Sequence, residues 1–300
     1  MISGRLFDIQ RFSINDGPGI RTCIFMKGCN LHCTWCHNPE SQASQPEIRY
    51  QPEKCIYCGS CISVCPSSSH RINERFVHTF QRSKCISCTQ CANICNTKAL
   101  DLIGREFTVE QVIAEVLKDQ ELYDLSGGGM TLTGGEPLVQ PTFALALLQA
   151  AHVEGIHTAI ETAGCVSWNT IERISKETDL FLYDLKGFNP KQHFLNTGQD
   201  NKLILTNLQR LAQEHHIIVR MPLIADLNDS TEEAKRYANF LEPLNGITQI
   251  ELLPYHRFGE AKYAPLGRKV TCFNAPSAEH LQRLADIYSA IGKQVIVHTA

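Results

Sequence analysis

The chain has no surplus of positive charge and no long hydrophobic run. Its 300 residues include 28 Lys and Arg against 31 Asp and Glu, a formal net charge of -3. Nucleic acid is therefore not expected as a main partner, because binding a phosphate backbone needs clustered positive charge. The longest apolar stretches, such as ALALL and IIV, are far too short to span a membrane, and the N-terminal MISGRLFDIQRFS lacks the apolar segment of a signal peptide. We expect a cytoplasmic protein with no membrane partner.

Cysteine, by contrast, is abundant. The chain has 14 cysteines, and all but three of them lie between Cys29 and Cys95. A reducing compartment keeps thiols free, so this crowding indicates metal ligation rather than disulfide bonds. The remaining three, Cys23, Cys165 and Cys272, are isolated in the sequence and are expected to be small buried side chains.

Most of the chain alternates β-rich apolar runs with helical patterns. The expected strands cover residues 22–27, 129–134, 156–162, 180–186, 217–224 and 247–254, with 294–299 as a late addition. The clearest helix begins near Val109, where Thr108 and Gln111 form a capping-box pair. Six βα units predict an α/β fold, an open or partial (β/α)6 barrel of the TIM type, with its chemistry at the C-terminal ends of the strands.

A cysteine-rich module interrupts this pattern. Residues 51–100 are expected to be an insert between a first barrel segment, 1–50, and the remainder of the barrel, 101–300. The insert contains the pattern C-x2-C-x2-C-x3-C twice, as Cys55, Cys58, Cys61, Cys65 and as Cys85, Cys88, Cys91, Cys95. Structural zinc is the alternative, but zinc ribbons separate two C-x2-C pairs by about 12–20 residues.

This pattern resembles that of bacterial two-cluster ferredoxins, in which the fourth cysteine of each run binds the other 4Fe-4S cluster. The resemblance implies one cluster on Cys55, Cys58, Cys61 and Cys95 and a second on Cys85, Cys88, Cys91 and Cys65.

A third cysteine group follows the first expected strand. Cys29, Cys33 and Cys36 form C-x3-C-x2-C in the loop at the C-terminal end of that strand. Three thiolates can hold a four-iron cluster while one iron has no protein ligand, and an open coordination position is typical of a catalytic metal site. His32 and His37 flank the loop and are the alternative source of a fourth ligand.

The loop, with Trp35 directly before its last cysteine, resembles the cluster loop of the radical S-adenosylmethionine superfamily. In that family the open iron binds the amino and carboxylate groups of S-adenosylmethionine, and one electron then cleaves the sulfonium to give a 5′-deoxyadenosyl radical. The TGGEP segment, 133–137, resembles the Gly-Gly-Glu motif of the family. This resemblance implies that Gly134, Gly135 and Glu136 hold the methionyl amino group.

Further charged residues stand at or near other expected strand ends. The resemblance implies that Lys186 faces the cofactor carboxylate, that Glu161 and Asp184 serve its amino group or a monovalent cation, and that His256 approaches its ribose or adenine. Arg220, inside the fifth expected strand, is costly to leave unpaired and could contact the cofactor carboxylate. The alternative for each is a solvated charge at a strand end, although their coincidence on one rim favours function.

The segment Asp16-Gly17-Pro18-Gly19, a good tight turn, followed by Arg21, resembles the D-G-P-G-x-R signature of glycyl-radical-enzyme activating enzymes. The resemblance implies an oxidoreductase that abstracts the α-hydrogen of a glycine in a partner enzyme and releases 5′-deoxyadenosine and methionine. It also implies three 4Fe-4S clusters and reduced flavodoxin or ferredoxin as electron donor. The sequence does not determine the oligomeric state, and we expect a monomer that docks transiently on a larger partner. A radical enzyme acting on a small molecule and an electron carrier or zinc scaffold are the alternatives. The inserted clusters would either relay electrons or help dock the partner.

Overall fold

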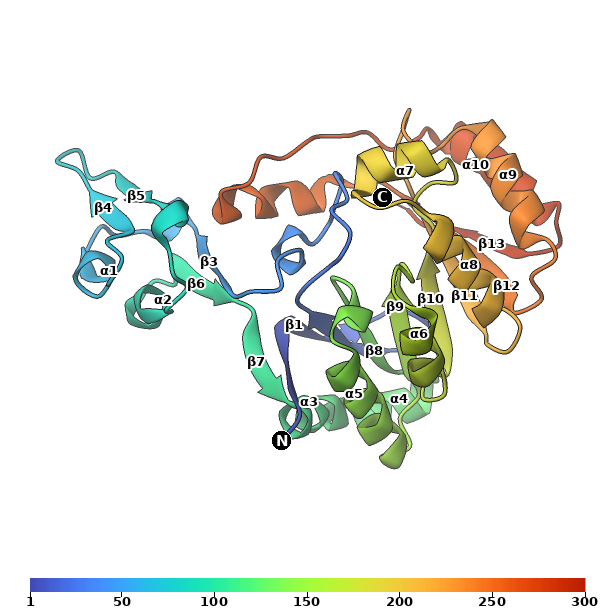
Figure 1. Cartoon of the computed structure of the whole chain (residues 1–300), viewed down its shortest axis with the longest axis horizontal. Helices are drawn as coiled ribbons and strands as arrows, with labels where there is room; N and C mark the ends of the chain where they lie inside the picture. The colour runs from blue at the N-terminus through green and yellow to red at the C-terminus, as the bar shows by residue number, and fades with distance from the viewer. Residues whose placement is uncertain (300) are drawn as a thin grey trace.

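The computed structural model describes residues 1–299, which form one large curved sheet with a small unit projecting from one side (Figure 1). The sheet has nine strands in the order β13-β12-β11-β10-β9-β8-β2-β1-β7. These are β1 (Ser3–Ser13), β2 (Arg21–Met26), β7 (Arg105–Thr108), β8 (Gly129–Gly134), β9 (Thr158–Thr162), β10 (Leu180–Asp184), β11 (Ile217–Leu223), β12 (Ile247–Pro254) and β13 (Gln294–Val297).

The sheet is dominated by parallel pairing. Strands β2 and β8 through β13 all run parallel to one another, whereas β1 runs antiparallel to both β2 and β7. Within the part of the chain that the structure describes, β7 and β13 are the two edges, and no pairing closes the sheet. The predicted α/β class is confirmed, and each of the seven expected strands is present. The antiparallel strands β1 and β7 were not predicted.

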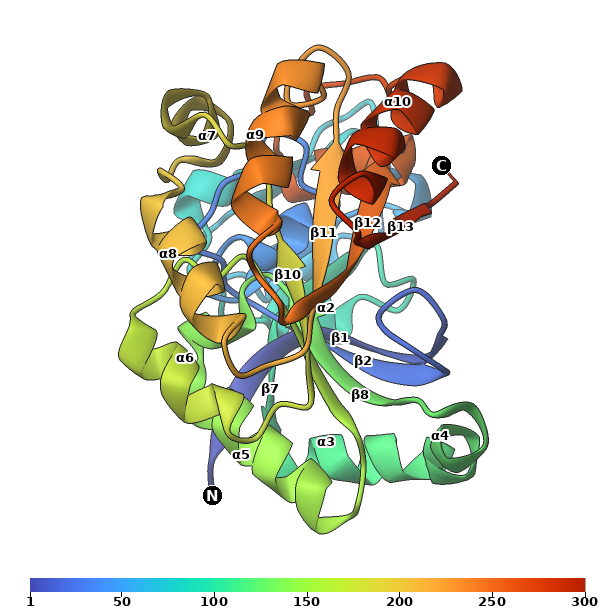
Figure 2. The ribbon, with the colours of Figure 1, turned by 90° about the vertical axis from the view of Figure 1, so that its right-hand side faces the viewer.

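Helices cover the outer face of the sheet, as Figure 2 shows for α5, α6, α8, α9 and α10. The helices of this layer and its flanks are α3 (Val109–Val116), α4 (Gln120–Ser126), α5 (Pro141–Val153), α6 (Trp168–Ser175), α7 (Pro190–Thr197), α8 (Lys202–Leu211), α9 (Thr231–Leu241) and α10 (Ala278–Ser289). The predicted capping box of α3 is confirmed, since Thr108 and Gln111 each accept a bond from the other's backbone N–H. None of the helices within residues 1–299 is long and apolar enough to cross a membrane.

Alternation along each strand separates a structural face from a functional one. Ile160, Tyr183 and Val219 point into the main apolar core between sheet and helices. Their neighbours Glu161 and Arg220 point to the opposite, concave face and line a cleft there. Because side chains alternate between the two faces, charged residues lie on the inner face of strands whose outer face is largely apolar.

The projecting unit is an internal duplication. It contains β3 (Glu47–Tyr50), α1 (Ser60–Ser63), β4 (His70–Ile72), β5 (His78–Phe80), α2 (Gln90–Ile94) and β6 (Leu100–Ile103), and β3 pairs with β6 while β4 pairs with β5. The interval from Cys55 to Cys85 equals the interval from the start of α1 to the start of α2. Left-handed backbone recurs at the same interval, with φ of 57° at Tyr57 and 53° at Ser87. The two halves thus share one backbone plan.

Ion pairs attach the insert to the rest of the molecule. Glu47, at the start of β3, lies 3.0 Å from the Nζ of Lys27 and 2.7 Å from a guanidinium nitrogen of Arg268. Lys27 is buried and also donates to the carbonyl of Glu40, and Arg268 donates to the carbonyl of Pro39. Both carbonyls belong to the segment that follows the three-cysteine loop, so the insert is anchored next to that loop.

The Asp16–Arg21 signature segment is anchored by a buried arginine. The guanidinium of Arg21 has no exposed surface and donates to the Thr131 hydroxyl and to the carbonyls of Met130, Pro18 and His157. Arg21 therefore fastens the loop between β1 and β2 to strand β8. Its role in the structure is to position that loop.

Replacing Arg21 by Met should destabilise the fold strongly, because it leaves several buried acceptors without donors. At roughly 1–3 kcal/mol for each unsatisfied group, we expect a loss on the order of 3 kcal/mol, seen as a lower Tm in circular dichroism of the anaerobic protein. The control is Arg173→Met on the exposed face of α6, which should change stability by less than about 0.5 kcal/mol. Equal Tm values for the two variants would contradict this role for Arg21.

Candidate active site

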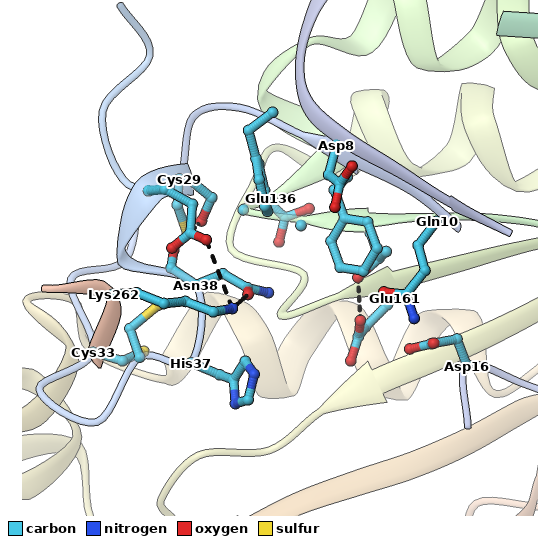
Figure 3. A pocket seen from close by; sticks show the side chains of 18 of the residues that line it. Asp8, Gln10, Asp16, Cys29, Cys33, His37, Asn38, Glu136, Glu161 and Lys262 are labelled. Atoms are coloured by element: carbon cyan, nitrogen blue, oxygen red, sulfur yellow. Dashed lines mark hydrogen bonds and ion pairs between the residues drawn. The ribbon is translucent and has the colours of Figure 1, made fainter. Parts of the chain in front are cut away.

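A cleft of about 1120 Å³ opens at the C-terminal ends of the parallel strands. Every residue of the cluster loop and strand ends that the sequence nominated lines it, namely Cys29, Cys33, Trp35, Cys36, Gly134, Gly135, Glu136, Glu161, Asp184, Lys186, Arg220 and His256. Figure 3 shows Cys29 and Cys33 at one side of this cleft and Glu161 with Asp16 at the other. Side chains from widely separated strands thus converge on one site.

The three-cysteine loop is held in place by its own backbone. The amides of Gly28 and Cys29 donate to the carbonyls of Ser41 and Gln42, which closes the base of the loop. Its outer turn is bonded to the end of α7, because the His32 amide donates to the Thr197 carbonyl at 2.7 Å. The Tyr263 hydroxyl donates to the Cys36 carbonyl at 2.9 Å. The loop is therefore fixed at both ends before any ligand binds.

The loop thiols have the environment of metal ligands. Burial raises the pKa of the Cys29 thiol well above its ordinary value and that of Cys33 to about 12. Such thiols ionise readily only when a metal replaces their protons. Three of them facing one cleft suit an iron–sulfur cluster bound by three thiolates.

The two histidines of the loop lie differently. The His32 side chain is exposed and does not line the cleft, whereas His37 lines the cleft with its ring edge-on to His256, 4.5 Å between centroids. Within residues 1–299, neither forms a compact ligand group with two of the loop cysteines.

The two glycines after β8 are required by close packing. A Cβ on Gly135 would lie 2.1 Å from the Gly28 carbonyl oxygen, and one on Gly134 would lie 2.5 Å from the Met26 amide nitrogen. The Gly135 amide donates to the Met26 carbonyl and that of Glu136 to the Gly28 carbonyl. The Gly-Gly pair thus joins the end of β8 directly to the cluster loop.

Glu136 is a buried carboxylate with a full set of protein partners. Its oxygens accept from the Thr162 hydroxyl at 2.8 and 2.9 Å and from the amides of Ala163 and Leu138 at 3.0 and 3.1 Å. Burial raises its pKa to about 7, against these hydrogen bonds. In this structure Glu136 therefore connects β8 with the end of β9.

Arg220 lies at the centre of a buried charge cluster. Its Nη1 is 2.8 Å from Glu161, and its Nε is 3.2 Å from Glu251, an ion pair without an aligned hydrogen bond. Its Nη2 donates to the Asn15 carbonyl at 2.7 Å. Burial alone would lower the pKa of Arg220. Glu161 and Glu251 outweigh this effect, so the pKa lies above its ordinary value. The guanidinium is thus already paired within the protein.

Asp184 and Lys186 form a second ion pair, 2.8 Å apart, at the end of β10. Burial alone would lower the pKa of Lys186, but Asp184 more than offsets it, so the amine stays charged beside the cleft. Cys33 lies close enough to feel this charge, which favours its thiolate. A fixed ammonium next to a metal-binding thiol is suited to an anionic group.

His256 carries a vacant hydrogen-bonding position. Its Nδ1 is buried and, among the residues described, has no partner. Buried polar atoms are almost always paired, so an orphan on the wall of a cleft indicates a missing ligand atom. Together with the thiols and Lys186, it fits a bound S-adenosylmethionine and its cluster.

Sequence reasoning missed Glu251 and Lys262, and it noted Asp16 only as part of the signature turn. Glu251 and Asp16 face Arg220, and Lys262 donates to Asn38 in the cluster loop at 2.9 Å. Glu251 alternates with apolar neighbours on β12, which is a signal that could have identified it. Of the isolated cysteines, Cys23 is fully buried as expected.

The expected burial of Cys272 is wrong. It is exposed, with its sulfur 3.5 Å from Glu260, because it stands in an extended segment without regular structure. Cys165 is only partly buried.

Two family models match the chain. The one described as "Radical SAM superfamily" matches residues 85–238, and the one described as "4Fe-4S dicluster domain" matches residues 47–96.

Curated relatives match over nearly the whole chain. The trans-4-hydroxy-L-proline dehydratase activating enzyme of Clostridioides difficile is 41% identical over 95% of this chain and 96% of its own. The choline trimethylamine-lyase activating enzyme of Oleidesulfovibrio alaskensis is 40% identical over 87% of this chain and 86% of its own. The benzylsuccinate synthase activating enzyme of Thauera aromatica is 39% identical over 97% and 91%.

Among solved structures, a domain of a pyruvate-formate lyase-activating enzyme from Bacteroides vulgatus covers 57% of this chain and 99% of its own, with a TM-score of 0.50 and 30% identity. QueE from Escherichia coli covers 100% of this chain and 96% of its own with a TM-score of 0.50, and at 11% identity it bears on the fold alone.

Replacing Arg220 by Met should destabilise the protein by about 3–5 kcal/mol, because Glu161 and Glu251 then remain as buried charges without a partner. The double variant Arg220→Met with Glu161→Gln should recover part of this loss, since it removes one of those charges. Chemical unfolding of the anaerobic protein measures both.

The control for Arg220 is Lys118→Met, which breaks the exposed ion pair with Glu115 and should cost less than about 1 kcal/mol. A loss in Arg220→Met no larger than in this control would show that the charge cluster does not hold the site together.

Proposed function

Because the chain belongs to the radical SAM superfamily and, within it, to the activating enzymes of glycyl-radical enzymes, we propose that its cleft binds S-adenosylmethionine beside a cluster on Cys29, Cys33 and Cys36. The observation that carries this proposal is the convergence of three half-buried cysteines, the Lys186 ammonium and the vacant His256 nitrogen on one cleft. The loaded site supplies one electron for reductive cleavage of S-adenosylmethionine, which gives methionine, 5′-deoxyadenosine and a glycine radical on the partner. The open sheet serves as the partial (β/α)6 barrel of this family.

The side chains divide the binding work. Lys186 is charged, lies beside Cys33 and pairs with the cofactor carboxylate. His256 forms a hydrogen bond with the ribose or the adenine through its free ring nitrogen. Gly134 and Gly135 offer backbone at the amino group. Trp35, largely buried, fills the loop behind the cluster and packs edge-on against Phe273.

Glu136, Glu161 and Arg220 act chiefly by positioning. Glu136 fixes the end of β9, and Arg220 compensates Glu161. Both Glu161 oxygens have protein partners, Arg220 and Thr133, so a monovalent cation here would have to share them, with Asp184 completing its shell.

The insert, 51–100, holds two further 4Fe-4S clusters. A small cavity is lined by Cys55, Cys58, Cys61 and Cys95, which supports the exchange of the fourth cysteine between the two runs. Cys65 correspondingly lies near Cys91, whose pKa is raised by burial and by Cys85, Cys88 and Cys65. With the cluster of the barrel, this gives three clusters per chain.

The partner is a glycyl-radical enzyme, and the donor is a reduced flavodoxin or ferredoxin of the cytoplasm. A monomer docking its open cleft on the glycine loop of a larger partner suits the open sheet. The partners named for the relatives, a choline lyase, a hydroxyproline dehydratase and benzylsuccinate synthase, supply the chemical classes to try first.

We expect the anaerobic protein, with S-adenosylmethionine and reductant, to produce a glycine-centred electron paramagnetic resonance signal on a glycyl-radical enzyme from such a panel. The reason is that the reaction ends on a protein glycine. Cys29→Ala should abolish both this signal and 5′-deoxyadenosine, whereas Cys272→Ala, an exposed cysteine outside every group, should retain both. Release of 5′-deoxyadenosine without a protein radical on any partner would favour a small-molecule substrate.

Iron content tests the insert. Three four-iron clusters give about twelve irons per chain, and replacing the eight insert cysteines should leave about four. If the inserted clusters relay electrons, that variant should install the glycine radical more slowly with reduced flavodoxin or ferredoxin as donor. An unchanged rate would exclude the relay and favour a docking role.

A further inference from the structure

Two buried histidines of the insert have no role in the function described so far. His70 on β4 and His78 on β5 are 3% and 6% exposed. The His78 Nδ1 lies 3.7 Å from the Cys55 sulfur, and its Nε2 lies 3.7 Å from the Cys61 sulfur and 3.1 Å from the His70 Nδ1. His78 also lines the cavity formed by the four cysteines of this half. The pair therefore faces the ligands of one cluster.

The other half of the duplication has no such pair. The strand register places Leu100 of β6 at the position of His70 and Ile48 of β3 at that of His78, and both are 2% exposed. The two halves thus have the same cysteine spacing and the same backbone plan, but they differ in these two buried side chains. Chance burial of two polar rings is costly, so the difference calls for a function.

The rings are held rigidly. His70 stacks on Phe80 with 4.6 Å between centroids, and His78 packs edge-on against Tyr50 at 4.7 Å. The His70 Nδ1 and the His78 Nε2 lie 3.1 Å apart, so one of these nitrogens donates and the other accepts. A neutral imidazole has one donor and one acceptor nitrogen, which this contact requires.

This geometry restricts where the protons lie. A cluster thiolate can only accept, so the His78 Nδ1 must carry the proton if it is to bond Cys55, and its Nε2 then accepts from the His70 Nδ1–H. In the other tautomer the His78 Nε2–H points toward Cys61 and His70 instead. In that second tautomer the nearer acceptor is the His70 Nδ1, so the inference rests on the first tautomer, in which the His78 Nδ1–H is directed at the Cys55 sulfur.

We propose that His78, positioned by His70, donates a hydrogen bond to a thiolate of the cluster on Cys55, Cys58, Cys61 and Cys95, and thereby gives it a higher reduction potential than the cluster on Cys85, Cys88, Cys91 and Cys65. A hydrogen bond to a ligand sulfur stabilises the more negative, reduced state of a cluster, whereas the apolar Ile48 and Leu100 offer none. This inference rests on the proposed presence of both clusters.

The location of His70 and His78 indicates which of the two clusters has the higher reduction potential. Figure 1 shows β4, β5 and α1 at the outer end of the insert, with α2 and β6 nearer the barrel. The more easily reduced cluster is therefore the outer one, where an external protein donor has access. If the inserted clusters relay electrons, this outer cluster is the one at which an electron enters the chain.

The test is a potentiometric titration of the anaerobic, fully loaded protein, followed by electron paramagnetic resonance. In His78→Ile, which copies the other half, the higher of the two inserted-cluster potentials should fall with iron content unchanged. A tenfold drop in the ratio of reduced to oxidised cluster at a fixed potential corresponds to about 59 mV for one electron. His78→Gln, which keeps an N–H, should restore much of the shift, and His70→Leu should produce a smaller fall.

The control is His216→Leu, an exposed histidine outside the insert, which should move no potential. Unchanged potentials in His78→Ile, or a shift confined to the lower-potential cluster, would overturn the proposal.

Cys61, His70 and His78 also have ligand atoms within 4.8 Å of one another. Stoichiometric zinc in the wild type, or loss of about four irons in both His78 variants, would show that the histidines are ligands instead. Iron content and radical formation of the wild type are measured separately. A failure of the proposed function can therefore be distinguished from a failure of this inference about His78.

Discussion

The whole arrangement depends on the contact between the end of β8 and the cluster loop. Gly134 and Gly135 have no room for a side chain because the backbone of Met26 and Gly28 lies against them. That contact brings the three thiols over the strand ends where Glu136, Lys186 and His256 stand. A metal site with a vacant position is useful only if a substrate can be held beside it, and this contact sets that distance.

The charged side chains of the cleft are paired with one another, which offsets the cost of burying them. Arg220 is placed between Glu161 and Glu251, and Lys186 beside Asp184, so each buried charge has a partner in the chain. Among the residues described, the buried Nδ1 of His256 is one of the cleft atoms that has no hydrogen-bond partner. Both buried cations are thus fixed in place by carboxylates of the chain, and a site preorganised in this way lowers the cost of reorganisation.

Much of this could be read from the sequence, and the failures have physical causes. The parallel strands are continuous apolar runs, and strand-end residues such as Glu161 and Lys186 follow from them directly. Strand β1 was missed because it is half exposed along most of its length and pairs antiparallel with both of its neighbours, so its apolar signal is weak. Arg220 was correctly placed facing the cleft, but its partners Glu251 and Asp16 depend on which segments become neighbours in space. The His70 and His78 pair likewise appears only once the register of β4 and β5 is known.

The central claim is that the cluster on Cys29, Cys33 and Cys36 has one iron without a protein ligand, to which S-adenosylmethionine binds. It is tested most directly by electron paramagnetic resonance of the reduced, oxygen-free variant that lacks the insert cysteines, recorded with and without S-adenosylmethionine. The account predicts a clear change in the cluster signal when the cofactor is added. An identical signal in both samples, with His37 or another side chain found as a fourth ligand, would contradict it.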